Sequence, residues 1–64
     1  MQNRVKEYRE KNKMTQEQLA EKAEVSRNTI SSLETKTNAN VTYEIMQKIA
    51  KALDKKVATI FFEW

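Results

Sequence analysis

The sequence contains no cysteine, histidine, glycine or proline among its 64 residues. Without cysteine, neither a disulfide nor a thiolate-metal site can support the fold, so the packing of apolar side chains must do so. Histidine and cysteine are also common catalytic groups, and no acidic cluster suggests a metal site. We therefore expect no enzyme activity, no metal and no cofactor.

Long apolar runs are absent as well, because no stretch approaches the roughly 20 residues that a membrane-spanning helix needs. The first residues, Met1 to Arg4, lead into no signal-peptide core. These absences predict a cytoplasmic protein with no membrane partner. With 12 Lys and Arg against 9 Asp and Glu, the net charge is +3. This charge is compatible with nucleic-acid binding but is weak support for it.

Because glycine and proline are absent, helix boundaries must be inferred from capping residues and from breaks in apolar periodicity. Good helix formers from about Arg4 to Lys11 predict a first helix. Thr15 is the next candidate N-cap, and Gln18, three residues later, completes a capping box. We expect this second helix to end near Ala23.

Two more polar residues are candidate caps later in the chain. Ser26 is the predicted N-cap of a third helix. Thr42 is the predicted cap of the clearest amphipathic helix, whose apolar positions are Ile45, Met46, Ile49, Ala50 and Leu53. The apolar tail 57–64 predicts a last helical turn, although its β propensity leaves its end open. The pattern favours an all-α fold of five helices, forming a single domain over residues 1–64.

The second and third helices are short, and the turn between them covers residues 23–25. Two such helices must cross steeply, and the small side chain of Ala20 permits their close approach. The second helix of such a pair can enter a DNA major groove, where Arg27 would suit guanine and Asn28 would suit adenine. An ordinary helical bundle with a solvated polar face is the alternative, which periodicity alone favours.

The segment 14–34, MTQEQLAEKAEVSRNTISSLE, closely resembles the helix-turn-helix of the lambda-repressor-like Cro/repressor family, also called the XRE family. The likeness continues upstream through 4–9 and downstream through 48–53. It implies a compact five-helix domain that binds double-stranded operator DNA, usually as a homodimer on an inverted repeat, with the third helix in the major groove. It also implies a bacterial or phage transcriptional regulator, most often a repressor, that acts at the nucleoid. No small-molecule ligand is evident.

The resemblance assigns roles to individual polar residues. Arg27, Asn28 and Ser32 fall where the family reads bases. Gln16 matches a family glutamine that holds a phosphate and braces the recognition helix. Five further residues are expected to contact the DNA backbone, or else to be solvated surface: Thr15, Ser26, Ser31, Lys36 and Asn38. Such backbone contacts position the protein on DNA without specifying the sequence.

Arg9 and Glu34 match a family ion pair that ties the first helix to the end of the third. Loss of one partner would leave an unpaired charge and could tilt the third helix. The chain departs from the family at Glu24, which stands where glycine is common. That turn must hold a non-glycine residue at strained dihedral angles or use a different geometry. Lys55 and Lys56 replace the usual cap of the last helix, and we expect both to be solvated.

Three of the last four positions are aromatic: Phe61, Phe62 and Trp64. Not all of them can fit inside so small a domain. Phe61 aligns with a core position of the family, and the resemblance implies a dimer interface around the last helix. We expect Ile60, Phe62 and Trp64 to contribute to that interface, although Phe62 and Trp64 could equally pack on their own subunit.

A protein-interaction module on the same fold, such as an antitoxin that neutralises a toxin, is the alternative function. It predicts that the aromatic C-terminus binds a different protein and that Arg27→Ala leaves the main activity intact. A transcriptional regulator would instead lose operator binding in that variant. A helical bundle with no partner is disfavoured, because Gln16, Arg27 and Asn28 all fall where the family needs them.

Overall fold

The computed structural model describes residues 3–35 and 41–62. Within these ranges it contains five helices, and no described residue lies in a β-strand: α1 (Val5–Lys11), α2 (Gln16–Ala23), α3 (Arg27–Thr35), α4 (Tyr43–Ala52) and α5 (Val57–Phe61). This confirms the predicted all-α architecture. The first helix begins one residue later than expected, and the segment with β propensity is helical as far as Phe61.

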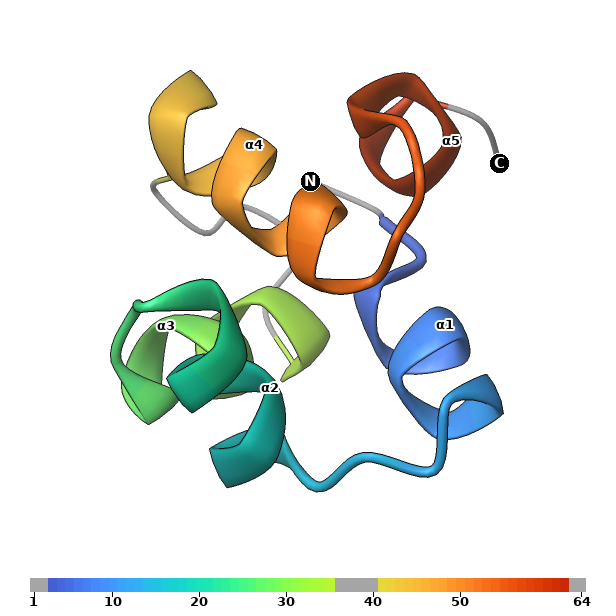
Figure 1. Ribbon diagram of the computed structural model, residues 1–64. Helices are drawn as coiled ribbons and strands as arrows, with labels where there is room; N and C mark the ends of the chain where they lie inside the picture. Colours follow the sequence, from blue (N-terminus) through green and yellow to red (C-terminus); the bar gives the residue numbers. More distant parts are fainter. Residues whose placement is uncertain (1–2, 36–40, 63–64) are drawn as a thin grey trace.

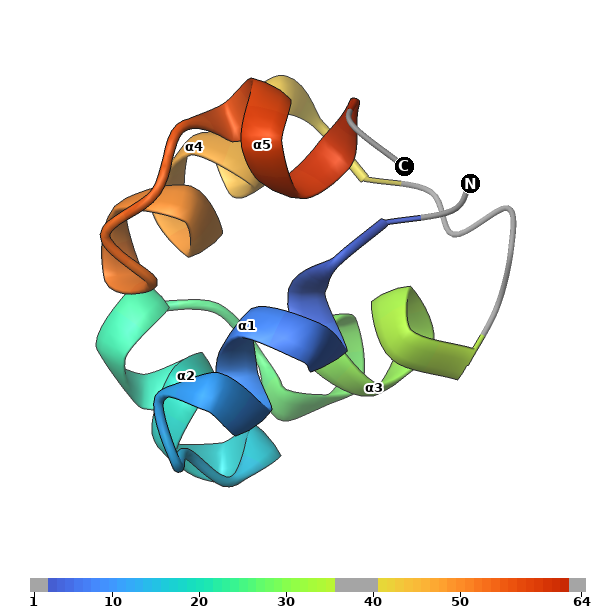
Figure 2. The ribbon, with the colours of Figure 1, turned by 90° about the vertical axis from the view of Figure 1, so that its right-hand side faces the viewer.

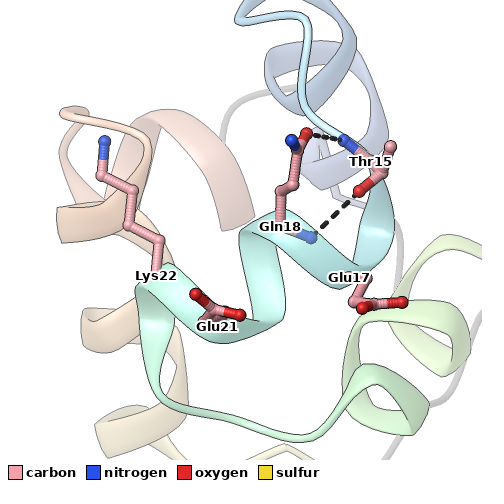
Figure 3. Close-up of a pocket in the computed structure, with 5 residues that line it drawn as sticks. All are labelled: Thr15, Glu17, Gln18, Glu21 and Lys22. Carbon is pink, nitrogen blue, oxygen red and sulfur yellow. Dashed lines mark hydrogen bonds between the residues drawn. The ribbon is translucent and has the colours of Figure 1, made fainter.

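Three helices begin at the hydroxyl side chains that the sequence indicates. The Thr15 hydroxyl accepts a hydrogen bond from the Gln18 backbone N–H at 3.0 Å, and the Gln18 side chain accepts one from the Thr15 N–H at 2.8 Å (Figure 3). Ser26 and Thr42 accept bonds in the same way from the amide three residues on, at 3.1 and 3.2 Å. These bonds satisfy amides that have no partner within their own helix.

In the described part of the chain, three helices are followed within two residues by a non-glycine residue with left-handed backbone angles. Lys13, Glu24 and Asp54 have φ of 57°, 59° and 57°. After α2, the amide of Val25 donates to the carbonyl of Ala20 at 3.0 Å, which is the bond of a Schellman motif. Glycine commonly occupies this position because it has no Cβ, and the chain has no glycine. Glu24 therefore adopts the strained geometry, the first of the two possibilities left open by the sequence.

The core lies where all five helices meet. Helix α2 packs against α3 and α4, α1 packs against α3 and α5, and α4 packs against α5. Helices α2 and α3 lie together in Figure 1, and in Figure 2 α4 and α5 cover the core from the side opposite α1 and α2. Among the described residues, thirteen buried apolar side chains form one cluster: Val5, Leu19, Ala20, Ala23, Ile30, Leu33, Met46, Ile49, Ala50, Ala52, Leu53, Ile60 and Phe61.

Ile60 belongs to this core and not to the surface. Its side chain is fully buried in its own subunit, so it has no area to offer a second copy. The prediction that Ile60 lies in a dimer interface is therefore wrong. Helix α5 contacts both α1 and α4, and this packing buries two consecutive residues, Ile60 and Phe61. Phe62 follows them and is 55% exposed, while Trp64 lies outside the described residues.

Candidate nucleic-acid interface

Helix α3 has one buried apolar side and one polar side that faces solvent. Arg27 and Asn28 are exposed in its first turn, Ser31 and Ser32 are half-buried one turn later, and Thr35 is exposed at its end. Guanidinium, amide and hydroxyl groups are all able to hydrogen-bond to base edges in a major groove. The three predicted base-reading residues, Arg27, Asn28 and Ser32, are thus carried on a single helix.

Helix α3 carries one positive and one negative side chain, so it has no net charge. Arg27 is exposed, while Glu34, the only acidic residue of α3, is held in an ion pair. A surface with one free cation and several neutral polar groups suits hydrogen bonding to bases more than strong, unspecific attraction to phosphates. The predicted phosphate contacts Lys36 and Asn38 lie outside the described residues.

The end of α3 is fixed to α1 by the side chain of Arg9. Its Nε donates to Oε2 of Glu34 at 2.7 Å and its Nη2 donates to Oε1 at 3.1 Å. A third bond, at 2.6 Å, joins Nη1 to the carbonyl oxygen of Met14. The Arg9 and Glu34 side chains are only 12% and 3% exposed, so this pair is largely removed from solvent. The hydrogen bond to Glu34 raises the pKa of Arg9 and keeps it charged.

Gln16, the first residue of α2, belongs to the same network. Its Nε2 donates to Oε1 of Glu34 at 3.2 Å, and its side chain is half-buried. The Gln16 side chain thereby links the start of α2 to the end of α3, and Gln16 follows the exposed Thr15 in the sequence. Glu34 thus receives bonds from both α1 and α2, which hold the end of α3 in one orientation relative to the rest of the domain.

The remaining predicted backbone contacts have local structural roles in the free protein. The Ser26 hydroxyl caps α3 and lies 2.9 Å from the hydroxyl of Thr29. The carbonyl of Ser31 accepts a bond from the Thr35 hydroxyl at 2.7 Å. Thr15 is exposed and its hydroxyl caps α2. A hydroxyl that accepts one bond still has its own proton to donate, so these roles are compatible with phosphate binding.

Asn3 is a residue that the sequence reasoning missed. Its Oδ1 accepts a bond from the backbone N–H of Val5 at 3.0 Å, and its Nδ2 donates to the carbonyl oxygen of Leu33 at 2.9 Å. An asparagine side chain often accepts a hydrogen bond from the amide two residues later, so this first partner has a local sequence signal. Its second partner lies 30 residues away, and no local pattern points to it.

A shallow hollow on α2 is lined by Thr15, Glu17, Gln18, Glu21 and Lys22, and Figure 3 shows these side chains along the exposed helix. In ranges 3–35 and 41–62, no group of three or more acidic side chains is arranged to hold a metal ion. None of the helices in those ranges combines the length and apolar character required to cross a bilayer.

One related protein is similar in sequence over most of the chain. An uncharacterized HTH-type transcriptional regulator of Archaeoglobus fulgidus is 43% identical over 61 residues, which cover 95% of this chain and 84% of that protein. The similarity therefore extends over the entire helix-turn-helix and the helices that support it.

Solved structures share the fold. The N-terminal DNA-binding domain of SinR from Bacillus subtilis has a TM-score of 0.81 and 34% identity, over 88% of this chain and 81% of that one. SinR, the master regulator for biofilm formation, in complex with DNA gives the same TM-score and identity, over 88% and 89% of the two chains. The helix-turn-helix family matches residues 5–60. The protein therefore belongs to the XRE-type helix-turn-helix family of DNA-binding transcriptional regulators, the family that its sequence resembles.

Proposed function

We propose that the protein represses transcription by binding an operator as a homodimer, with α3 of each subunit in the major groove. The observation that carries this proposal is the polar side of α3, where Arg27 and Asn28 are exposed in the first turn. The opposite end of the same helix is fixed through Glu34. A helix that is rigidly held and presents its first turn to solvent fits the docking geometry of a recognition helix.

In this arrangement Arg27 donates two bonds to guanine, and Asn28 makes a paired donor and acceptor contact with adenine. Ser32 reads a base one turn further along α3. The backbone contacts come from Thr15, Gln16, Ser26 and Ser31, joined by Lys36 and Asn38 from the loop after α3. These contacts set the register of the domain on the duplex but do not select its sequence.

Repression is the simplest outcome of such binding. A domain that occupies an operator excludes polymerase from an overlapping promoter by its volume alone. Activation would require an additional surface that contacts polymerase.

Two copies fit side by side on adjacent half-sites. The domain measures 22 × 20 × 19 Å, which is less than the roughly 34 Å between the centres of half-sites one helical turn apart. Phe62 is an exposed aromatic residue at the end of α5, and we assign the contact between subunits to Phe62 and Trp64. An inverted repeat follows from the two-fold symmetry of such a dimer.

The test is selection of duplexes from a random-sequence pool by the purified protein, followed by affinity measurements on the enriched sequence. We expect an inverted repeat for the wild type. Arg27→Ala and Asn28→Ala should each lower affinity for it by about ten- to a hundredfold and relax preference at one position in each half-site.

Lys56→Ala is the matched control for Arg27→Ala. It also removes one exposed positive charge, but from the turn before α5, so it should leave the base preferences of the protein unchanged. No enrichment by the wild type at moderate salt would contradict the proposal. That result, with Arg27→Ala behaving like the wild type, would favour the protein-interaction module.

A further inference from the structure

The short segment Asn3–Arg4, which we call the strap, bonds to the ends of two helices. The Asn3 side chain donates to the carbonyl of Leu33 in the last turn of α3 at 2.9 Å. The backbone N–H of Arg4 donates to the carbonyl of Ile60 in α5 at 2.7 Å. The last four carbonyls of any helix lack partners within that helix. The strap therefore satisfies one such carbonyl in α3 and one in α5.

The Asn3 side chain is itself held in place. Its Oδ1 accepts the Val5 amide at 3.0 Å, and the residue is partly buried. Each end of the planar amide group thus has a fixed partner, one in α1 and one in α3. Asn3 is therefore oriented by local backbone before it contacts the recognition helix, so little side-chain freedom remains to be lost.

The hydrogen bond to Leu33 lies next to residues that matter for the proposed function of α3. Leu33 stands between Ser32, a proposed base-reading residue, and Glu34, which is bonded to Arg9 and Gln16. The Glu34 bonds restrain a side chain, whereas Asn3 restrains the backbone itself. Two restraints on adjacent residues fix both the position of the last turn and its rotation about the helix axis.

We propose that Asn3 is a positioning residue that sets the rotation of the recognition helix and thereby the base preference of its last turn. This inference rests on the proposed function, because it concerns how α3 meets an operator. Through the Arg4 bond, the strap also joins α3 to α5, the helix that precedes the proposed subunit contact. The strap in this way couples the orientation of the base-reading surface to α5, which lies next to the proposed contact between the two subunits.

The test compares the Asn3→Ser variant of the 64-residue chain with the wild type. Serine keeps a short acceptor for the Val5 amide and adds no charge, but its side chain cannot reach the Leu33 carbonyl. Ala52→Gly, at the buried end of α4, serves as the control for stability, since it lowers helix propensity and removes a buried methyl group, and so destabilises at least as much as one lost hydrogen bond. Circular dichroism defines a temperature at which all three proteins are folded.

At that temperature we expect Asn3→Ser to bind the selected operator about three- to tenfold more weakly than the wild type. Its altered base preference should be confined to the positions facing the last turn of α3, while those facing Arg27 and Asn28 remain unchanged. Ala52→Gly should match the wild type in both affinity and preference.

Three results would overturn the proposal, and they can be told apart. If the wild type selects no operator, the proposed function fails and the role of Asn3 fails with it. If the wild type selects an operator and Asn3→Ser binds it with the same affinity and preference, only the role of Asn3 fails. If Asn3→Ser and Ala52→Gly lose affinity equally with unchanged preferences, Asn3 is a stability residue only.

Discussion

The pair formed by Arg9 and Glu34 has different consequences for its two partners. Glu34 is almost fully buried and accepts bonds from Arg9 and Gln16, while Arg9 has a further acceptor in the Met14 carbonyl. Removing the arginine leaves a buried carboxylate with one neutral donor, which is costly because a buried charge needs compensation. The value of the pair lies mainly in the orientation that it enforces on α3.

We predict that Arg9→Met lowers the free energy of unfolding by about 3 kcal/mol, measured by chemical denaturation. The double variant Arg9→Met, Glu34→Leu should recover part of that loss, because no buried charge is left without a partner. A double variant less stable than Arg9→Met would contradict this account.

The pKa of Arg9 is raised in the folded protein. The contribution of its charge to the free energy of unfolding is therefore complete below the ordinary pKa of arginine and is lost only at still higher pH.

The ring of Tyr8 lies close to the ammonium groups of two lysines. The Nζ atoms of Lys11 and Lys55 lie 5.0 and 5.6 Å from the centre of the Tyr8 ring. Lys55 is exposed as expected, yet its ammonium group is also placed for a cation–π contact. The half-buried tyrosine therefore links α1 to the turn that precedes α5.

Helices α1, α2 and α4 are each followed within two residues by a left-handed residue that carries a Cβ, and each of these residues stores backbone strain. A non-glycine residue in this region costs about 1–2 kcal/mol. The geometry persists because the Schellman bonds and the packing of the following residue hold it, as with half-buried Val25 after Glu24. Because this chain has no glycine, it loses stability at the ends of these helices.

We predict that Glu24→Gly raises the free energy of unfolding by about 0.5–1 kcal/mol. Relief of strain outweighs the added freedom of glycine in the unfolded chain. Glu21→Gly is the matched control, since it makes the same chemical change at an exposed position inside α2 and should destabilise by about 1 kcal/mol. Thermal denaturation of both variants measures the two effects, and a decrease for Glu24→Gly would refute the strain argument.

Helix α5 is short, and its packing separates buried from exposed aromatic residues. Phe61 is fully buried, and the next residue, Phe62, is 55% exposed. We predict that Phe62→Lys leaves the domain folded but shifts it from dimer to monomer in sedimentation equilibrium, because a charge would be buried at the proposed contact. Tyr43→Lys is the control, since it introduces the same charge at a residue in α4 that is 60% exposed, and it should leave the dimer intact. Equal dissociation of both variants would show that the contact between subunits does not involve Phe62 specifically.

On the scale of the whole molecule, charge governs how operator binding responds to salt. The net charge is +3, and each phosphate that a lysine or arginine neutralises releases bound counterions from the duplex. We predict that the logarithm of operator affinity falls linearly with the logarithm of salt concentration, measured by fluorescence anisotropy. The slope should be roughly −0.9 for each phosphate that a lysine or arginine neutralises in the dimer, and a flat response would exclude a phosphate contact by Lys36.

Much of the architecture was predictable because it depends on information close together in the chain. The capping groups at Thr15, Ser26 and Thr42 act on amides three residues away. The apolar periodicity of each helix similarly identifies its buried side without reference to the others. The family resemblance added the partner of Arg9, which lies 25 residues away and has no local signal.

The sequence by itself determined the number of helices, where most of them begin, and which polar residues lie on α3. Only the tertiary structure decided that Ile60 is buried, that Glu24 accepts left-handed geometry, and that Asn3 reaches Leu33. The physical reason is distance along the chain. Caps and periodicity act within one or two helical turns, whereas burial at α5 and the bond to Leu33 depend on how helices pack after they have formed.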